Sequence, residues 1–315
     1  MSAPPTRRPP VATDASPRGI FVGLATLDVI HRVDRAPAAN EKITAAQQFM
    51  AAGGPAANAA VTFAALGGSA VLVTALGDGP IARLIRDELE ACDVRVVDVA
   101  PDLDADAPVS SVAVLQGSGE RSVIGGDAAA VRAASPDGEW WDRALQVEIA
   151  LIDGHHPDLA RAATVAATRS RVPVVVDAGR WKPVMHDIMG GATDVVASAD
   201  FRLPETSSAR ETALALVAAG VPNVVTTSGP DPVQWWSGED SGAVTVPVTE
   251  ARDTLGAGDV FHGAYAFATA HGELLPARIA FASRIAAIRC AHIGPRSWLD
   301  AVRADRAAPS DQGAS

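Results

Sequence analysis

The feature of this sequence that most constrains its fold is a regular alternation of short apolar runs with longer helical patterns. The runs expected to form strands cover 19–24, 71–75, 94–99, 148–153, 173–177, 194–197 and 223–227. The expected helices cover 58–66, 81–92, a stretch after 157, 182–189, 205–219, a stretch from inside 253–262 to 271, and 276–291. Strands that alternate with helices of this length predict an α/β fold with a mostly parallel central sheet and helices on both faces.

Several further segments do not fit this alternation. The polar-to-apolar stretch 42–52 is expected to be a strand outside the main sheet. The runs 110–116 and 121–125 flank Gly117-Ser118-Gly119-Glu120, which predicts a hairpin. We expect a small β-sheet from about 40–52 and 109–126 beside the main domain. Residues 233–236 and 243–246 are expected to form an antiparallel pair.

Composition and length predict one domain at 19–304, because 315 residues with 48% hydrophobic and 20% charged side chains can bury a large core. Residues 1–18 and 305–315 are expected to be disordered tails. A net charge of −11 argues against nucleic-acid or anionic-membrane surfaces. Cys92 and Cys290 lie in helical patterns and favour reduced thiols. With no apolar run long enough for a membrane span, we expect a cytoplasmic protein.

The strongest candidate site lies between Asp253 and His262. Gly256 and Gly258 flank Ala257 at the start of the expected helix, so the backbone can approach a ligand without a Cβ in the way. The first N–H groups of a helix have no internal partner and favour a phosphate. Asp259 follows in the first turn, with the wrong charge to bind a phosphate. It is either an ordinary cap or a base that acts on the group attacking phosphorus.

A second set of candidates lies upstream. The run from Gly19 predicts a buried parallel strand whose C-terminal end delivers Asp28, where ligands gather in open α/β sheets. That carboxylate can accept hydrogen bonds from vicinal sugar hydroxyls, or it can be an ordinary turn aspartate. Gly53-Gly54 would let the backbone approach a substrate, although Gly-Gly-Pro alone is a turn signal. Asn58 can donate to and accept from hydroxyls.

Two negative observations limit the nucleotide and metal chemistry. The lysines, Lys42 and Lys182, follow no glycine-rich loop, so a Walker-type phosphate loop is absent and a nucleotide would need backbone amides and arginines. His155 and His156 have no cysteine or third histidine at ligand spacing, which argues against a metal there. A substrate-side role for this pair stays open.

The segment Asp253-Thr254-Leu255-Gly256-Ala257-Gly258-Asp259 resembles the C-terminal signature of the ribokinase/PfkB carbohydrate kinases, and Gly53-Gly54-Pro55-Ala56-Ala57-Asn58 resembles their N-terminal signature. The likeness covers roughly 19–300 and is nearest to the ketohexokinase and sulfofructose kinase branch. It implies a ribokinase-like fold, a small sheet that is a lid over the sugar, and a homodimer through that lid. It also implies ATP with Mg²⁺, and a monovalent cation such as K⁺, ordered in part by Asp253.

The sequence departs from the family pattern at two places. Ser198-Ala199-Asp200-Phe201 replaces the usual Asn-x-x-Glu, so the glutamate that organises Mg²⁺ and phosphate in many members is missing. The nucleotide-side segment Thr227-Ser228-Gly229-Pro230-Asp231-Pro232 lacks its second glycine. Thr227, Ser228 and Gly229 can still offer backbone to phosphate, but Pro230 and Pro232 supply no N–H.

The resemblance implies ATP-dependent phosphorylation of a sugar hydroxyl, with a ketose such as fructose or a derivative as the expected substrate. Asp28, Gly53, Gly54 and Asn58 would hold the sugar. Asp259 would be the general base, with its pKa lowered by the helix terminus. The amides of Gly256, Ala257 and Gly258 would stabilise the transferred phosphoryl group. The alternatives are a nucleoside kinase of the adenosine type and a non-catalytic sugar sensor that keeps the fold.

Overall fold

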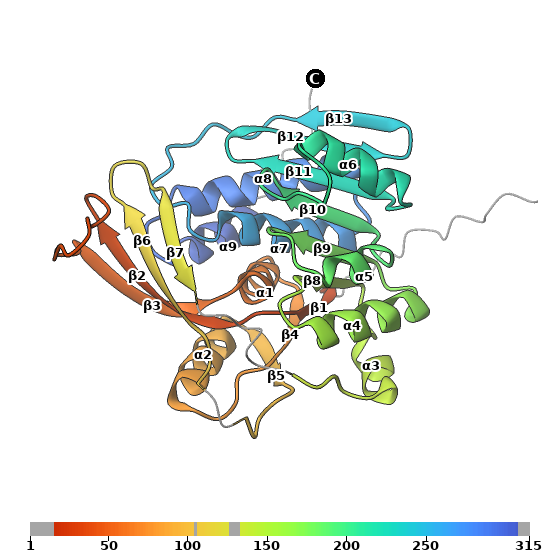
Figure 1. The fold of residues 1–315 in the computed structure, drawn as a ribbon, viewed down its shortest axis with the longest axis horizontal. Coiled ribbons are helices and arrows are strands. Elements are labelled where there is room, and N and C mark those ends of the chain that lie inside the picture. The colour runs from red at the N-terminus through yellow and green to blue at the C-terminus, as the bar shows by residue number, and fades with distance from the viewer. Residues whose placement is uncertain (1–15, 104–105, 126–132, 308–315) are drawn as a thin grey trace, which may run out of the picture.

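A nine-stranded, mostly parallel sheet forms the centre of the structure, as the alternation predicts (Figure 1). The computed structural model describes residues 16–103, 106–125 and 133–307. The strand order is β13-β12-β11-β10-β9-β8-β1-β4-β5. The strands are β1 (Arg18–Val22), β4 (Ser69–Thr74), β5 (Val94–Asp98), β8 (Ile149–Ile152), β9 (Val174–Ala178), β10 (Asp194–Ser198), β11 (Asn223–Ser228), β12 (Asp231–Ser237) and β13 (Asp240–Val244).

Helices cover both faces of this sheet and bury its apolar strands (Figure 1). One face packs against α1 (Pro55–Ala65), α2 (Pro80–Ala91), α7 (Ala257–Ala270), α8 (Leu275–Cys290) and α9 (Leu299–Ala307). The other packs against α3 (Gly138–Ala144), α4 (Pro157–Ser170), α5 (Met185–Met189) and α6 (Ala209–Ala218). Strands buried on both faces read as continuous apolar runs, which is why β8 and β9 were easy to locate.

The predicted antiparallel pair is present, and it belongs to the main sheet. β12 pairs with β11 and with β13 in antiparallel register, so the three strands form a meander at one edge. The turn between β11 and β12 contains Gly229, whose φ of 56° lies in the left-handed region that glycine tolerates. The two antiparallel strands therefore begin directly after the C-terminal end of β11.

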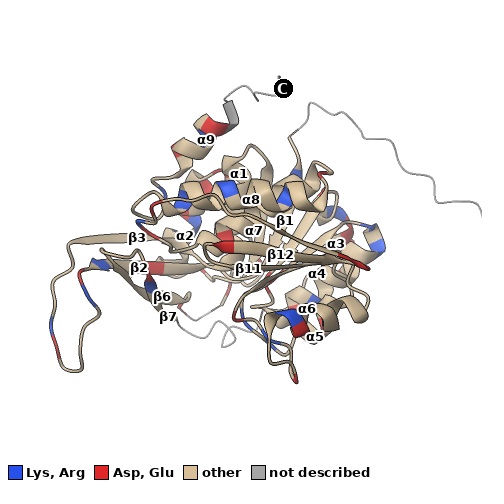
Figure 2. Cartoon of the chain, turned by 90° about the horizontal axis from the view of Figure 1, so that it is seen from above, with Lys and Arg blue, Asp and Glu red and all other residues tan. Residues whose placement is uncertain are grey.

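A separate four-stranded sheet lies to one side of the main domain, in the order β3-β2-β6-β7 (Figure 1). Its strands are β2 (Thr26–Val33), β3 (Gln47–Gly53), β6 (Val109–Leu115) and β7 (Arg121–Gly125). The small sheet predicted from 40–52 and 109–126 therefore exists. The loop between β2 and β3 projects away from the domain (Figure 2).

The prediction of a single strand from Gly19 to Asp28 was wrong. The structure divides this run into β1, which lies in the main sheet, and β2, which lies in the small sheet. Asp28 is inside β2, where it pairs with Ala51 on β3 and Ser110 on β6. The chain changes sheets between Val22 and Thr26, and an apolar run carries no periodic mark of such a change.

The domain limits differ slightly from those expected at 19 and 304. β1 begins at Arg18, and α9 continues to Ala307. The remainder of both expected tails, 1–15 and 308–315, lies outside the described residues. Cys92 and Cys290 are free, partly buried thiols. Within the described part of the chain, none of the helices has the length and apolarity required to span a membrane.

Candidate active site

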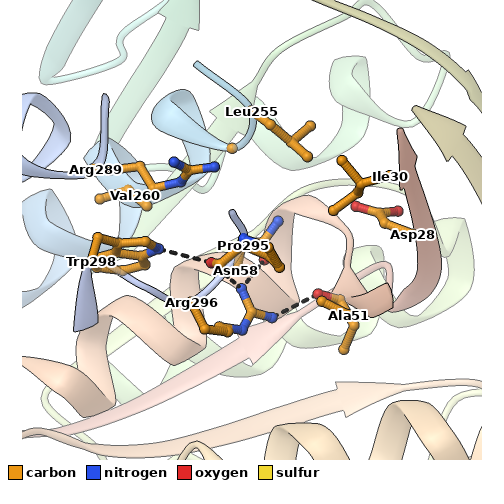
Figure 3. A pocket seen from close by; sticks show the side chains of 12 residues that line it. Asp28, Ile30, Ala51, Asn58, Leu255, Val260, Arg289, Pro295, Arg296 and Trp298 are labelled. Atoms are coloured by element: carbon orange, nitrogen blue, oxygen red, sulfur yellow. Dashed lines mark hydrogen bonds between the residues drawn. The ribbon is translucent and has the colours of Figure 1, made fainter. Parts of the chain in front are cut away.

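A pocket lies where the small sheet meets the main domain (Figure 3). Its walls come from β2, β3, α1, the loop before α7 with the first turn of that helix, the end of α8, and the loop between α8 and α9. The lining residues are Asp28, Ile30, Ala51, Ala52, Asn58, Leu255, Gly256, Val260, Arg289, Pro295, Arg296 and Trp298. Asp28, Asn58 and Gly256, which the sequence analysis took from distant segments, therefore line one pocket.

Asp259 lies beside this pocket in the first turn of α7. Gly256 is the N-cap of this helix, and its φ of 71° explains why glycine stands there. The Nδ2 group of Asn58 donates a hydrogen bond of 2.8 Å to Oδ2 of Asp259. Asn58 itself lies in the first turn of α1, which starts at Gly54 with φ 100° and Pro55. The two family-like segments thus meet at this hydrogen bond.

The predicted direction of the Asp259 pKa was wrong. Burial, followed by the charge of Asp177, raises the pKa of the Asp259 carboxyl to about 6. The hydrogen bond from Asn58 and the charges of His262 and Arg121 act in the opposite direction. At pH 7 a carboxyl with this pKa is still mostly ionised, so it can accept a proton.

Asp28 is a second carboxylate at this pocket, and it is buried. Burial raises the pKa of its carboxyl to about 6, and the charge of Asp259 adds to this while a hydrogen bond from Ser110 opposes it. A Cβ built on Gly53 would lie 2.1 Å from Oδ2 of Asp28, which explains the glycine at this position. At Gly54 a Cβ would lie 2.3 Å from the carbonyl oxygen of Leu24. Gly53 is therefore required for close packing against Asp28, and Gly54 for close packing against the backbone at Leu24.

Asp253 has protein partners on both carboxylate oxygens. Its Oδ1 accepts from the backbone N–H of Leu255 at 3.0 Å and lies 3.2 Å from Nη2 of Arg289, while Oδ2 accepts from Gly294 N–H at 2.9 Å. Asp253 and Arg289 are both buried. This carboxylate orders the loop before α7 through an ion pair. A monovalent cation ordered in part by Asp253 stays a prediction.

The small sheet is tied directly to the loop before α7. Thr254 donates two hydrogen bonds to the carbonyl oxygen of Gly119, from its backbone N–H at 3.0 Å and from Oγ1 at 2.8 Å. Gly119 is buried in the β6–β7 turn, and a Cβ there would come within 2.9 Å of the carbonyl carbon of Arg252. The turn therefore touches the segment that leads to Asp259.

The predicted nucleotide-side residues lie elsewhere. Thr227 and Ser228 end β11, and Gly229 opens the turn that follows. Thr227 Oγ1 donates to Ala197 O at 3.4 Å, beside Ser198, whose Oγ donates to Gly179 O at 2.9 Å. These residues share the C-terminal edge of the parallel sheet but do not line the pocket described above. Their position suits a ligand that extends along that edge.

A group of charged residues at the C-terminal end of β9 was not predicted from the sequence. Asp177 Oδ2 on β9 lies 3.3 Å from Nδ1 of His262 on α7, and both side chains are buried. Lys182 Nζ donates to Asp153 O at 2.9 Å. The aspartate at the end of the apolar run Val174-Val175-Val176 was the available signal for Asp177. The other contacts arise only from the packing of distant segments.

His155 and His156 lie at the start of α4, outside the pocket. Burial lowers the pKa of both imidazoles below the ordinary value for histidine, so both are neutral at pH 7. The N–H of His155 donates to Oδ1 of Asp153 at 2.9 Å. Among residues 16–103, 106–125 and 133–307, no group of histidine, cysteine or acidic side chains is arranged to hold a metal ion.

Comparison with known proteins agrees with this arrangement. Residues 18–301 match the model of the pfkB family carbohydrate kinases. The ribokinase of Bacillus subtilis is 24% identical over 282 residues, which cover 88% of this chain and 94% of that protein. A solved structure of a ribokinase-like protein from Agrobacterium tumefaciens superimposes with a TM-score of 0.81 at 24% identity, covering 93% of this chain and 98% of the other. The ribokinase of Arabidopsis thaliana, solved with ribose and ATP, gives 0.73 at 21%, covering 92% and 99%. The chain therefore belongs to the pfkB family of carbohydrate kinases.

Proposed function

We propose that this phosphotransferase moves the γ-phosphoryl group of ATP to a hydroxyl of an uncharged monosaccharide, with Asp259 as the general base. The observation that supports this most strongly is the contact between Asn58 and Asp259 at the first turn of α7. It combines a proton acceptor, a helix N-terminus and a polar pocket at one place. Family membership supplies the reaction class, phosphoryl transfer to an alcohol.

In this proposal the sugar lies between Asp28 and Asn58, with the backbone at Gly53 and Gly54 close to it. Its attacking hydroxyl faces Asp259. The oxygen of that hydroxyl forms a bond to the γ-phosphorus, the bond from phosphorus to the bridging oxygen breaks, and ADP leaves. The hydroxyl proton passes to Asp259 as the new bond forms.

Negative charge on the transferred group would be stabilised by the amides of Gly256, Ala257 and Gly258 at the N-terminus of α7. The N–H of Ala257 lies 3.3 Å from the carbonyl oxygen of Thr254, so it must leave that acceptor to bind a phosphoryl oxygen. Mg²⁺ would arrive as a complex with ATP, since the described residues provide no acidic cluster for it. Thr227, Ser228 and Gly229 would contact the nucleotide.

The charges of the pocket favour an uncharged sugar. Asp28 and Asp259 are negative when ionised and repel a phosphate or carboxylate. Of the two arginines that line the pocket, Arg289 is paired with Asp253 and Arg296 with Glu88. The charge of each guanidinium is therefore already balanced by a carboxylate of the protein.

A panel of acceptors tests this function through sugar-dependent ADP release. The panel contains fructose, as the ketohexokinase-like segments favour, ribose, after which the relatives are named, fructose 6-phosphate and adenosine. We expect turnover with a free sugar and little with fructose 6-phosphate. Preference for adenosine would identify a nucleoside kinase. Sugar binding by calorimetry without ADP release from any acceptor would identify a sensor and refute the proposal.

The homodimer is also a proposal. Met50 on β3, Val29 on β2, Ser111 on β6 and Ile124 on β7 form one row across the small sheet. Met50 is 65% exposed and Ile124 is 76% exposed, so this row presents two large apolar side chains to solvent. Such a face suits a second copy of the chain. Light scattering should show a dimer that Met50→Glu with Ile124→Glu converts to a monomer; a monomeric native protein would refute it.

A cytoplasmic location stays a prediction.

A further inference from the structure

Arg296 lies in the loop between α8 and α9, and Figure 3 shows it beside Asn58 and Ala51. It contacts three other elements. Its Nε donates to Oε1 of Glu88 on α2 at 2.7 Å, and its Nη2 lies 3.3 Å from Oε2 of the same carboxylate. Nη2 also donates to the carbonyl oxygen of Ala52 on β3 at 2.6 Å. Nη1 donates to Oδ1 of Asn58 on α1 at 3.1 Å and to Pro295 O at 3.3 Å.

These contacts use the complete donor capacity of the side chain. A guanidinium carries five N–H groups and no acceptor. Glu88 takes two of them, and Ala52, Asn58 and Pro295 take one each. Arg296 therefore lines the pocket without an N–H left for a ligand. Its effect on the reaction has to pass through the residues that it holds.

Among the residues that Arg296 contacts, Asn58 is the one that is bonded to the proposed general base. Because Oδ1 of Asn58 accepts from Arg296, its Nδ2 group points toward Oδ2 of Asp259 at 2.8 Å. If the amide turned over, its NH₂ group would face the guanidinium and its oxygen would face the carboxylate. Both of those contacts are repulsive, so the orientation is strongly determined.

We propose that Arg296 is a positioning residue that fixes the Asn58 amide and, through it, the carboxylate of the general base. This inference rests on the proposed role of Asp259. Glu88 anchors the guanidinium through two oxygens, and a planar fork holds direction better than a single ammonium. A lysine at position 296 can reach Glu88 but cannot reproduce the geometry toward Ala52 and Asn58 together.

Steady-state kinetics of Arg296→Lys, with the sugar that gives the highest turnover, provide the first test. Small displacements of a catalytic group cost up to about 100-fold, and we expect kcat to fall about 10-fold or more. KM for ATP should stay within about twofold, because Arg296 does not act on the nucleotide side. Arg303→Lys is the control, since Arg303 pairs with Asp300 and Asp93, and none of these three residues lines the pocket. It should match the native enzyme.

A double-mutant cycle with Asn58→Ala separates positioning from a general structural role. If Arg296 acts through Asn58, Arg296→Lys should change kcat less than about twofold in the Asn58→Ala background. Independent effects would multiply and would overturn the proposal. If Arg296→Lys fails to fold, Glu88→Gln takes its place in the experiment. Glu88→Gln should also lower kcat. An unchanged kcat in folded Glu88→Gln would contradict the proposal.

Nuclear magnetic resonance gives a readout that does not depend on turnover. The sequence has asparagine at three positions, Asn40, Asn58 and Asn223, so selective ¹⁵N labelling of their side chains yields three amide pairs. The NH₂ group of Asn58 should be protected from exchange with water in the native protein and should lose protection in Arg296→Lys. Equal protection in both proteins would overturn the positioning role. An inactive native enzyme with the expected loss of protection would instead overturn the proposed function alone.

Discussion

The side chains of Asn58 and Asp259 are 201 positions apart in the sequence and joined by a 2.8 Å hydrogen bond in the structure. The bond runs between the first turns of α1 and α7, so it connects the two segments that resemble family signatures. It places an amide donor on a carboxylate whose pKa burial has raised. Most of the expectations below depend on this contact.

Activity should depend on pH through the carboxylates. Because burial raises the pKa of both Asp259 and Asp28 to about 6, the base loses its charge as the pH falls through that value. We expect kcat/KM to fall below about pH 6 by between one and two log units per pH unit, since the two groups interact. In the native protein the hydrogen bond from Asn58 lowers the pKa of Asp259. Asn58→Ala removes this bond, so the pKa should rise and the limb should move to higher pH. A limb near pH 4 in the native enzyme would contradict this assignment.

Gly53→Ala should weaken sugar binding. A Cβ at this position would lie 2.1 Å from Oδ2 of Asp28, so the carboxylate must move. We expect KM for the sugar to rise about tenfold or more, while KM for ATP changes little. Gly117→Ala is a matched control in the same small sheet, because nothing lies within 4 Å of its Cβ. The measurement is KM for the sugar in both variants. A KM for the sugar in Gly53→Ala equal to that of the native enzyme would refute a role for Asp28.

Thr254→Val should loosen the contact between the small sheet and the loop before α7. It removes the 2.8 Å hydrogen bond from Oγ1 to Gly119 O and keeps the backbone bond. One such bond contributes about 0.5–1.5 kcal/mol. Hydrogen exchange in the β6–β7 turn should accelerate. We also expect kcat to fall a few-fold, on the prediction that the small sheet is a lid that excludes water from the sugar. Thr254→Ser keeps the hydroxyl and should behave as the native chain; equal exchange in all three would refute the contact's importance.

Metal removal should abolish turnover without changing the free protein. Because no acidic cluster for a metal occurs among residues 16–103, 106–125 and 133–307, we expect Mg²⁺ to bind together with ATP. Calorimetry should therefore detect Mg²⁺ binding only when nucleotide is present, and EDTA should stop ADP release. Tight binding of Mg²⁺ to the protein alone would contradict this view.

The sequence predicted the main features of the fold because they depend on local patterns. Apolar runs such as Val174–Ala178 and the small-residue start of α7 are legible without tertiary information. The strand through Asp28 was misplaced because nothing in an apolar run marks where the chain passes from one sheet to another. The α9 helix was not anticipated and carries the domain beyond its expected limit.

The site was predicted in part. Asp28, Asn58, Gly256 and Asp259 were located correctly as neighbours, since short glycine-bearing segments restrict backbone and ligand geometry together. The sign of the Asp259 pKa shift could not be obtained, because burial depends on everything packed around it. Arg296 and Glu88 are separated by 208 positions, and no local pattern connects them. Such ion pairs become visible only when the chain is folded.

The central claim is tested most directly by the turnover of Asp259→Asn with the preferred sugar, measured beside its affinity for ATP. Loss of a general base should lower kcat by about 10²–10⁴-fold, while calorimetry shows ATP binding close to native. Asp158→Asn, which changes an exposed aspartate in the first turn of α4, should keep full activity. A folded Asp259→Asn enzyme with near-native kcat would contradict the account.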